Sequence, residues 1–563
     1  MSETVYDHEV DVLVVGSGNG ALTAAICNHA MGTESVLVVE KSDKYGGSSA
    51  RSGGGIWVPC SRYTKAAGAE DSYEDALRYV KAVTPEDRFR EPMVSAYLKN
   101  APKMLDFLYD NSNVRYESLP IYPDYHTNLP GSRPGHRSHE PATVSGKVLG
   151  DHFDKLEPNG GLIGGRYMFK QTDMRTVSFT KWRRLFLFLR LGVVYWLDIF
   201  WWLKHTPTRW LTMGAAGVAR LFSSILDRKI PFWLNSPMEE LIVEDGCVVG
   251  AVVIHKGVTK HIKANKAVVL GAGGFEHNQE MRDQYLPKPS KVAWSIGTSN
   301  NTGDGIRAGQ KIGAQTALMD GAWWCNTQET PGNGYPLLQL SVRGQPGSIV
   351  VNKAGKRFIN EALDYVTTGN KFYDLLAEGA EVHPAYIIFD ANYKTTFPTF
   401  PFIGPDSLVP KELFESSAVA KGETLEELAH KLEIDPVGLK QTIDEFNEYA
   451  VEGKDKDFER GESVYENYFG DPRVGPNCNL APIAQGPFYA IRSDPGDMGT
   501  HGGLLTNPNG QVVHENGETI PGLYAVGNCC AAVLPAYAGP GSTLGPAMTF
   551  AYQAAKHINN YQD

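Results

Sequence analysis

The feature that most constrains the fold is a glycine-rich turn near the amino terminus. Residues 10–15 form an apolar, β-branched run that leads into Gly16-Ser-Gly18-Asn-Gly20-Ala21, and an alanine-rich segment follows. A second apolar run, residues 35–39, ends at Glu40. In this order, the glycines let the backbone approach a pyrophosphate, a helix N-terminus faces its charge, and the carboxylate accepts hydrogen bonds from ribose hydroxyls. We therefore expect an α/β chain with a Rossmann-type dinucleotide-binding domain.

The loop after Glu40 favours a flavin over a nicotinamide cofactor. Residues 46–55 read GGSSARSGGG, and a loop with so little bulk and so many amides and hydroxyls can lie against a second phosphate and a large planar ring. Two later runs, 267–274 and 522–528, resemble the other dinucleotide-contacting strands of two-domain FAD oxidoreductases. Where those enzymes often carry an acid, this chain has Asn528. We expect FAD as the cofactor.

The residues predicted to bind FAD lie in all these segments and in two further glycine-rich turns. They are Gly16, Ser17, Gly18, Gly20, Ala21, Glu40, Lys41, Gly47, Ser48, Ser49, Gly53, Gly54, Gly273, Gly274, Asn301, Gly303, Asp304, Gly527, Asn528, Ser542 and Leu544.

Length, charge and cysteine usage exclude several classes of protein. A chain of 563 residues exceeds a single core and predicts two or more domains. The net charge of −11 argues against nucleic acid as a partner. The 7 cysteines form no C-x-x-C pair, so we expect neither disulfides nor a metal site. Residues 1–10 are acidic and lead directly into the apolar run, so we expect no secretory signal and a cytoplasmic location.

One segment departs from the acidic average. Residues 181–209 read KWRRLFLFLRLGVVYWLDIFWWLKHTPTR, with basic residues and tryptophans interleaved and Asp198 as the single acid. The longest uncharged run, 191–197, is far shorter than the roughly 20 residues that cross a bilayer. This composition is typical of a helix lying at a membrane surface. We expect peripheral membrane association, and the alternative is an aromatic hairpin packed on the protein body or on a partner subunit.

These landmarks predict a discontinuous FAD-binding domain. Its first part covers residues 1–323 and is interrupted by the helical, membrane-associating insert at 155–228. A catalytic α+β domain follows at 324–492, and residues 493–563 return to the FAD-binding domain. The oligomeric state is left open.

A turn near the carboxyl terminus suggests an oxyanion hole. Residues 534–547 read LPAYAGPGSTLGPA and place the Tyr537 hydroxyl four residues before the Gly541 amide. A rigid turn that presents a phenolic donor and a backbone N–H to one point can polarise a ligand carbonyl.

Together these motifs resemble the flavin-dependent 3-ketosteroid Δ1-dehydrogenases of the fumarate reductase-like group. The resemblance rests on residues 16–23, 45–49, 122–125, 273–278, 301–305, 358–361 with Tyr365, 522–528 and 537–541. It implies desaturation of a 3-ketosteroid, with electrons leaving to an external acceptor. It further implies that Tyr365 is the base, that Tyr125 is its hydrogen-bond partner, and that Tyr537 and Gly541 bind the ketone.

The chemistry explains why these groups are needed. Desaturation next to a ketone removes a proton from the α carbon and a hydride from the β carbon, and two donors on the oxygen make the α proton more acidic. A tyrosine has an ordinary pKa of about 10, so it is a base only when its anion is stabilised.

Three rival functions stay open at this point. Two are enzymes of the same group, a steroid Δ4-dehydrogenase and a fumarate reductase-like enzyme. A dicarboxylate reductase needs cations for its substrate, and residues 537–545 contain none. The third is a membrane flavoprotein without catalytic activity.

Overall fold

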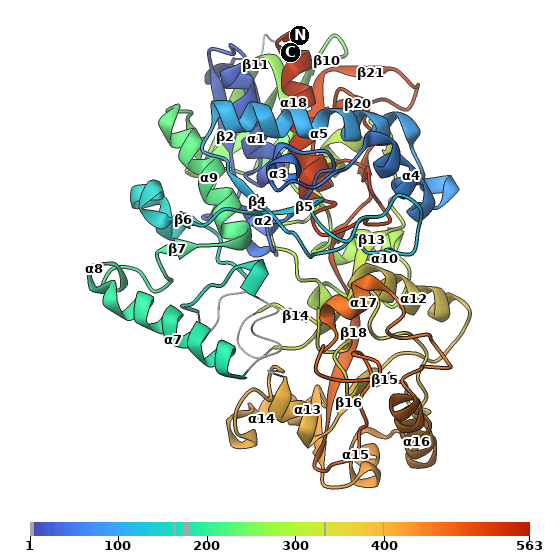
Figure 1. Cartoon of the computed structure of the whole chain (residues 1–563). Coiled ribbons are helices and arrows are strands. Elements are labelled where there is room, and N and C mark those ends of the chain that lie inside the picture. Colours follow the sequence, from blue (N-terminus) through green and yellow to red (C-terminus); the bar gives the residue numbers. More distant parts are fainter. Residues whose placement is uncertain (1–4, 161–164, 174–180, 331–333, 398, 563) are drawn as a thin grey trace.

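Two lobes make up the described part of the chain. The computed structural model describes residues 5–160, 165–173, 181–330, 334–397 and 399–562. In Figure 1 the upper lobe contains both ends of the chain and the lower lobe contains α12 to α17. Part of the predicted insert, residues 161–164 and 174–180, lies outside the described residues.

A mainly parallel sheet forms the centre of the upper lobe and confirms the Rossmann-type prediction. Its strand order is β20-β21-β11-β1-β2-β8, and every neighbouring pair from β21 to β8 is parallel. The hairpin of β9 and β10 extends β11. The strands are β1 (His8–Val15), β2 (Val36–Val39), β8 (Phe232–Trp233), β9 (Met238–Glu244), β10 (Cys247–His255), β11 (Val258–Leu270), β20 (Gln511–Val513) and β21 (Thr519–Ala525).

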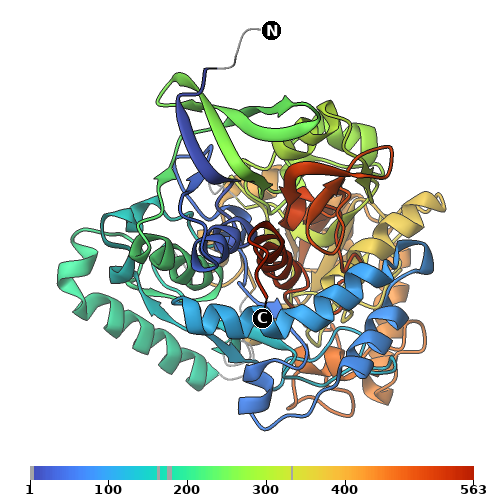
Figure 2. The same cartoon turned by 90° about the horizontal axis from the view of Figure 1, so that it is seen from above.

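Helices from distant parts of the sequence cover this sheet. In Figure 2, α1 and α18 lie side by side and α5 runs across below them in the view, and the contacts of α18 with both helices agree. Both α1 and α18 are rich in small residues, which allows this close packing. The helices of this lobe are α1 (Asn19–Ala30), α2 (Gly47–Arg51), α3 (Arg62–Ala66), α4 (Tyr73–Val83), α5 (Glu91–Asn111), α9 (Met213–Asp227), α10 (Gln279–Tyr285), α11 (Asp304–Lys311) and α18 (Leu544–Ile558).

Short strand pairs and triplets complete the upper lobe. They are β3 (Ile56–Trp57) with β5 (Ser138–Pro141) and β4 (Tyr116–Ser118), β6 (Val144–Ser145) with β7 (Trp210–Leu211), and β12 (Thr316–Ala317) with β19 (Gly503–Leu504).

The lower lobe is built on an antiparallel sheet of order β14-β13-β18-β16-β15, with β17 also paired to β18. Its strands are β13 (Ala322–Gln328), β14 (Leu337–Leu338), β15 (Ser348–Val351), β16 (Ala385–Phe389), β17 (Val419–Gly422) and β18 (Phe488–Thr500). Its helices are α12 (Tyr365–Ala377), α13 (Ala391–Thr396), α14 (Lys411–Glu415), α15 (Leu425–Leu432), α16 (Pro436–Glu452) and α17 (Val464–Phe469). The predicted domain boundaries at 324 and 492 fall inside β13 and β18, because these two strands run on without interruption between the lobes.

The basic aromatic segment forms two helices at the periphery of the molecule. In Figures 1 and 2, α7 (Lys181–Leu197) and α8 (Ile199–Trp202) lie at one edge, away from the central sheet. By contrast, α9, which the prediction includes in the insert, is buried against α1 and α2, and the glycines and alanines in its first two turns allow this close packing. Within the described residues no helix has both the length and the apolar composition that crossing a membrane requires.

Candidate active site

The first glycine turn brings the ends of β1 and β11 into contact. Gly16 has a φ of +105°, and a Cβ at this position would lie 2.3 Å from the carbonyl oxygen of Gly271, the residue after β11. Only glycine fits here. The turn therefore fixes the carboxyl edge of the parallel strands, where open α/β sheets bind their ligands.

Glu40 directly follows β2 next to this turn, as the sequence predicts. Ser17 Oγ donates a 2.5 Å hydrogen bond to its carboxylate and accepts one of 3.0 Å from the Gly46 amide. Burial raises the pKa of Glu40, and the hydrogen bonds from Ser17 and the Ser42 amide oppose that shift. The side chain is thus held at the edge of the sheet where a ribose would lie.

Hydrogen bonds connect the loop after Glu40 to α1 and to residues 298–301, and we call these glycine-rich segments together the cofactor cradle. Ser49 Oγ accepts the Asn19 amide of α1 at 3.0 Å. Ser48 Oγ accepts hydrogen bonds from the Thr298 amide at 2.9 Å and from Asn301 Nδ2 at 3.1 Å. Segments that are far apart in the sequence therefore form one wall.

The other predicted cofactor residues gather around the same edge. Gly18 immediately precedes α1, and Gly20 and Ala21 lie in its first turn. Gly47 begins α2 and Gly53 follows it, and Leu544 begins α18. Gly273 and Gly274 follow β11, Gly303 precedes α11, and Gly527 and Asn528 follow β21. The glycine turns, the amino ends of α1 and α18 and the Glu40 carboxylate fit a dinucleotide, with phosphates at the helix ends and a ribose at Glu40.

Four further predicted cofactor residues, Lys41, Gly54, Asp304 and Ser542, also have close contacts within the protein. Lys41 Nζ forms a 2.6 Å ion pair with Asp304. Ser542 Oγ donates to the carbonyl oxygen of Gly539 at 2.7 Å. A Cβ on Gly54 would lie 2.5 Å from the amide nitrogen of Gly214, so this glycine permits the approach of α9. These residues support the cradle through contacts that sequence spacing does not reveal.

The predicted catalytic tyrosines come together from three distant segments. The ring centroids of Tyr125 and Tyr365 are 5.5 Å apart, those of Tyr125 and Tyr537 are 5.7 Å apart, and those of Tyr365 and Tyr537 are 5.9 Å apart. Tyr365 is the first residue of α12. The ring centroid of Trp323, on β13, lies 6.4 Å from that of Tyr537. The three phenols therefore belong to one buried aromatic cluster.

The Tyr125 loop is fixed to the carboxyl-terminal turn. The Tyr125 amide donates to the carbonyl oxygen of Ala538 at 3.2 Å, and Tyr79 Oη donates to the same oxygen at 2.6 Å. The preceding residue, Asp124, forms a buried 2.8 Å ion pair with Arg137. Sequence reasoning missed these supports, although residue 124 lies inside the quoted 122–125 motif.

Gly541 occupies a position that only glycine fits. Its φ is +100°, and a Cβ would lie 2.4 Å from the Cα of Ile56. Burial raises the pKa of Tyr537, and hydrogen bonds from Tyr365, Thr543 and the Gly541 amide oppose the rise. The Gly541 N–H and the Tyr537 oxygen are therefore close neighbours, and their joint role as an oxyanion hole stays a prediction.

The environment of Tyr365 disfavours its anion in the protein alone. Burial raises its pKa well above the ordinary value and the neighbouring Tyr537 and Tyr122 add to the shift, whereas the Tyr125 hydroxyl lowers it. Tyr365 therefore keeps its proton at neutral pH, and its reactivity as a base increases as the pH rises.

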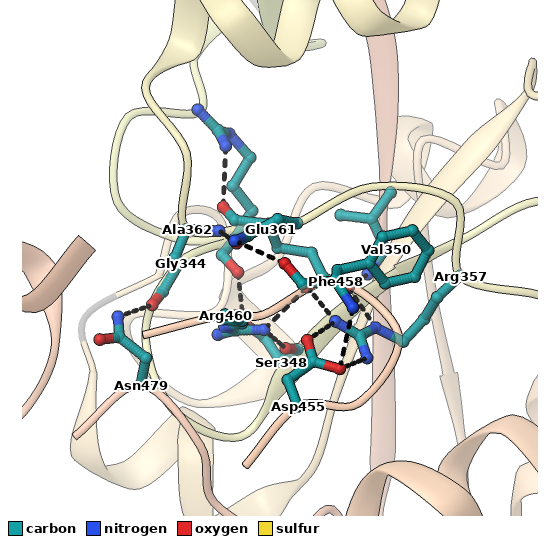
Figure 3. Close-up of polar contacts among 12 residues, drawn as sticks. Gly344, Ser348, Val350, Arg357, Glu361, Ala362, Asp455, Phe458, Arg460 and Asn479 are labelled. Atoms are coloured by element: carbon teal, nitrogen blue, oxygen red, sulfur yellow. Dashed lines mark hydrogen bonds and ion pairs between the residues drawn. The ribbon is translucent and has the colours of Figure 1, made fainter. Parts of the chain in front are cut away.

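A buried ionic network supports the loop that leads to Tyr365. Figure 3 shows the Glu361 carboxylate between Arg357, at 2.8 Å, and Arg460, at 3.1 Å. Arg357 also pairs with Asp455 at 2.7 Å. Glu361 lies in the 358–361 motif, but its partner Arg460 comes from a segment about a hundred residues further along the chain.

Comparison with known proteins assigns the family. The FAD binding domain family matches residues 11–544, which is nearly the whole chain. The chain belongs to this family. FAD is its cofactor.

Relatives within this flavoprotein family match the chain from end to end. The 3-oxosteroid 1-dehydrogenase of Mycolicibacterium smegmatis is 39% identical and covers 98% of this chain and 97% of the relative. The solved 3-ketosteroid Δ1-dehydrogenase of Sterolibacterium denitrificans, in complex with 1,4-androstadiene-3,17-dione, is 42% identical, with a TM-score of 0.94 over 99% of this chain and 100% of that chain. The 4-oxocyclohexanecarboxylate 2-dehydrogenase of Sinomonas cyclohexanicum is 35% identical, and the match covers 97% of this chain and 92% of the relative.

Proposed function

We propose that this flavoenzyme introduces a double bond between C1 and C2 of 3-ketosteroids. The observation that carries the proposal is the meeting of Tyr125, Tyr365 and Tyr537 in one buried cluster beside the Gly541 amide. A phenol with a hydrogen-bonding partner and a two-donor carbonyl site are what α-proton abstraction next to a ketone needs. The solved relative named above supports a steroid as the ligand.

Each residue has a separate task in this reaction. The Tyr537 hydroxyl and the Gly541 N–H donate to the ketone oxygen and stabilise enolate character. Tyr365 takes the C2 proton, and the Tyr125 hydroxyl stabilises its phenolate. Bound FAD supplies the acceptor for the hydride from C1. Aromatic rings around the three phenols exclude water, which strengthens these polar interactions.

Two alternatives differ in their substrate or in the bond they oxidise. A Δ4-dehydrogenase would desaturate C4–C5, and an enzyme like the Sinomonas relative would act on a small ring ketone. Anaerobic mixing with a ring-A-saturated 3-ketosteroid tests the assignment, because reduction of the flavin must coincide with a new C1–C2 double bond. A product with only a C4–C5 double bond contradicts it.

We further infer that α7 and α8 rest on an anionic membrane surface. Together these helices expose a run of large apolar side chains: Trp182, Leu185, Phe186, Leu189, Trp196, Leu197, Ile199 and Phe200. Leu187 and Tyr195 are buried and anchor α7, and Tyr195 Oη donates to the carbonyl oxygen of Thr206. The exposed Arg183 and Arg190 lie among these apolar groups and favour anionic headgroups by about 1 kcal/mol each.

This attachment explains how a lipid-soluble ketone reaches the protein. A steroid that retains its hydrocarbon side chain is concentrated in the bilayer, so an enzyme at the surface draws on a richer supply. We therefore include long-tailed sterol ketones among the substrates.

We expect the triple variant Trp182→Ser, Phe186→Ser and Phe200→Ser to lose vesicle binding. Burial of each large apolar side chain contributes roughly 1.5–3 kcal/mol, so removing three lowers partitioning more than tenfold. Cosedimentation with anionic vesicles measures the effect. The matched control is Leu408→Ser with Val437→Ser, two side chains that are equally exposed on the other lobe. The membrane inference is wrong if the triple variant folds and sediments with vesicles as the parent does.

A further inference from the structure

A buried carboxyl group lies directly behind the cofactor cradle. The Glu276 side chain is fully buried, and its Oε1 accepts a 2.6 Å hydrogen bond from Asn301 Nδ2. The same amide nitrogen donates to Ser48 Oγ at 3.1 Å. Ser48 and Asn301 are predicted cofactor residues, so two hydrogen bonds connect this carboxyl group to the cradle.

Glycines leave the space that the carboxyl group occupies. A Cβ on Gly297 would lie 2.6 Å from Glu276 Oε1, and one on Gly274 would lie 2.7 Å from Oε2. Oε2 is buried and has no hydrogen-bond partner among the described residues. An ionised carboxylate needs more donors than this site offers, whereas a protonated one needs fewer.

The charges around Glu276 do not balance if it is ionised. Arg282 Nη1 pairs with Asp497 at 2.7 Å and also donates to the carbonyl oxygen of Glu276 at 2.9 Å, so one cation faces two acids. The neighbouring His277 adds no positive charge, because burial lowers its pKa. Burial raises the pKa of Glu276 to about 7; Asn301 opposes the rise and Asp497 adds to it. A small change in nearby charge is therefore enough to change its protonation.

We propose that Glu276 is an internal proton site that gains a proton when the bound flavin is reduced. A hydride brings two electrons and one proton to the flavin, so the site gains one unit of negative charge. Glu276 then takes one proton from solvent and becomes neutral, and it releases that proton when the external acceptor removes the electrons. Reciprocally, a proton on Glu276 favours the reduced flavin. The proposal depends on FAD as the cofactor and not on the identity of the ketone.

Redox-difference infrared spectroscopy of the FAD-loaded protein tests this coupling without any steroid. On electrochemical reduction near pH 7, we expect the wild-type protein to gain a carbonyl-stretch band of a protonated carboxylic acid. Glu276→Gln should lack that band, and its flavin potential should vary less steeply with pH around neutrality. The matched control is Glu140→Gln, because Glu140 is another buried acid whose pKa burial raises, but it bonds to Gln171 and Thr172. This control should keep the wild-type band.

Two outcomes overturn the proposal. One is a wild-type spectrum with no carboxylic-acid band on reduction anywhere between about pH 6 and pH 8. The other is a band that survives in Glu276→Gln. Should Glu276→Gln fail to retain FAD, wild-type protein labelled with ¹³C-glutamate decides, because a band that does not shift with the label belongs to another group.

Discussion

Tyr365→Phe should bind FAD normally and lose nearly all turnover. The substitution removes one buried hydroxyl at the start of α12 and leaves the cofactor cradle untouched. Loss of a general base typically costs 10²- to 10⁴-fold, so we expect kcat to fall by about that factor. Exchange of the steroid C2 proton with deuterated water should stop as well. Mass spectrometry of the recovered steroid measures this exchange separately from hydride transfer.

The pH profile adds a second test of Tyr365. Because burial raises its pKa, the reactive phenolate becomes more abundant as the pH rises, and kcat/KM should increase through the neutral and alkaline range. That rising limb should disappear in Tyr365→Phe. Tyr373→Phe is the matched control, because Tyr373 is a buried tyrosine on the same helix whose hydroxyl bonds to Pro289 and Pro495. Rapid proton exchange in Tyr365→Phe would transfer the role of base to Tyr125.

Tyr537→Phe should slow the reaction by about 10²- to 10³-fold, the usual cost of one oxyanion donor. The base remains, but the enolate loses one of its two donors, so proton exchange should slow together with turnover. Stopped-flow measurement of flavin reduction checks the rate of the chemical step directly. The matched control, Tyr524→Phe, removes a hydroxyl that bonds to His557 on α18. An unchanged rate in Tyr537→Phe would place the ketone elsewhere.

The parallel sheet was predictable from local sequence. The turn at residues 16–21 and the terminal Glu40 encode the fold locally, because a positive φ and a close approach at Gly16 require glycine. The positions at which one lobe gives way to the other were harder to predict from the sequence. β13 and β18 run without a break between the lobes, so no loop or end of a strand marks the position where one lobe ends.

The candidate site also contains some features that the sequence predicts and others that it does not. That Tyr537 and Gly541 lie close together follows from their spacing in one turn. By contrast, Tyr365 stands out among 26 tyrosines only through the resemblance to a known family. The ion pair between Glu361 and Arg460 and the hydrogen bond from Asn301 to Glu276 join residues that are distant in the sequence. Spacing alone carries no information about such contacts, because they arise only when the chain has folded.

Anaerobic titration of the FAD-loaded protein with androst-4-ene-3,17-dione tests the central claim most directly. The proposed function predicts that the flavin bleaches in proportion to the steroid converted and that the product carries a new C1–C2 double bond. 4-Oxocyclohexanecarboxylate, added in parallel, should reduce the flavin far more slowly. A flavin that the steroid leaves oxidised, while the small ring ketone bleaches it, would contradict the account.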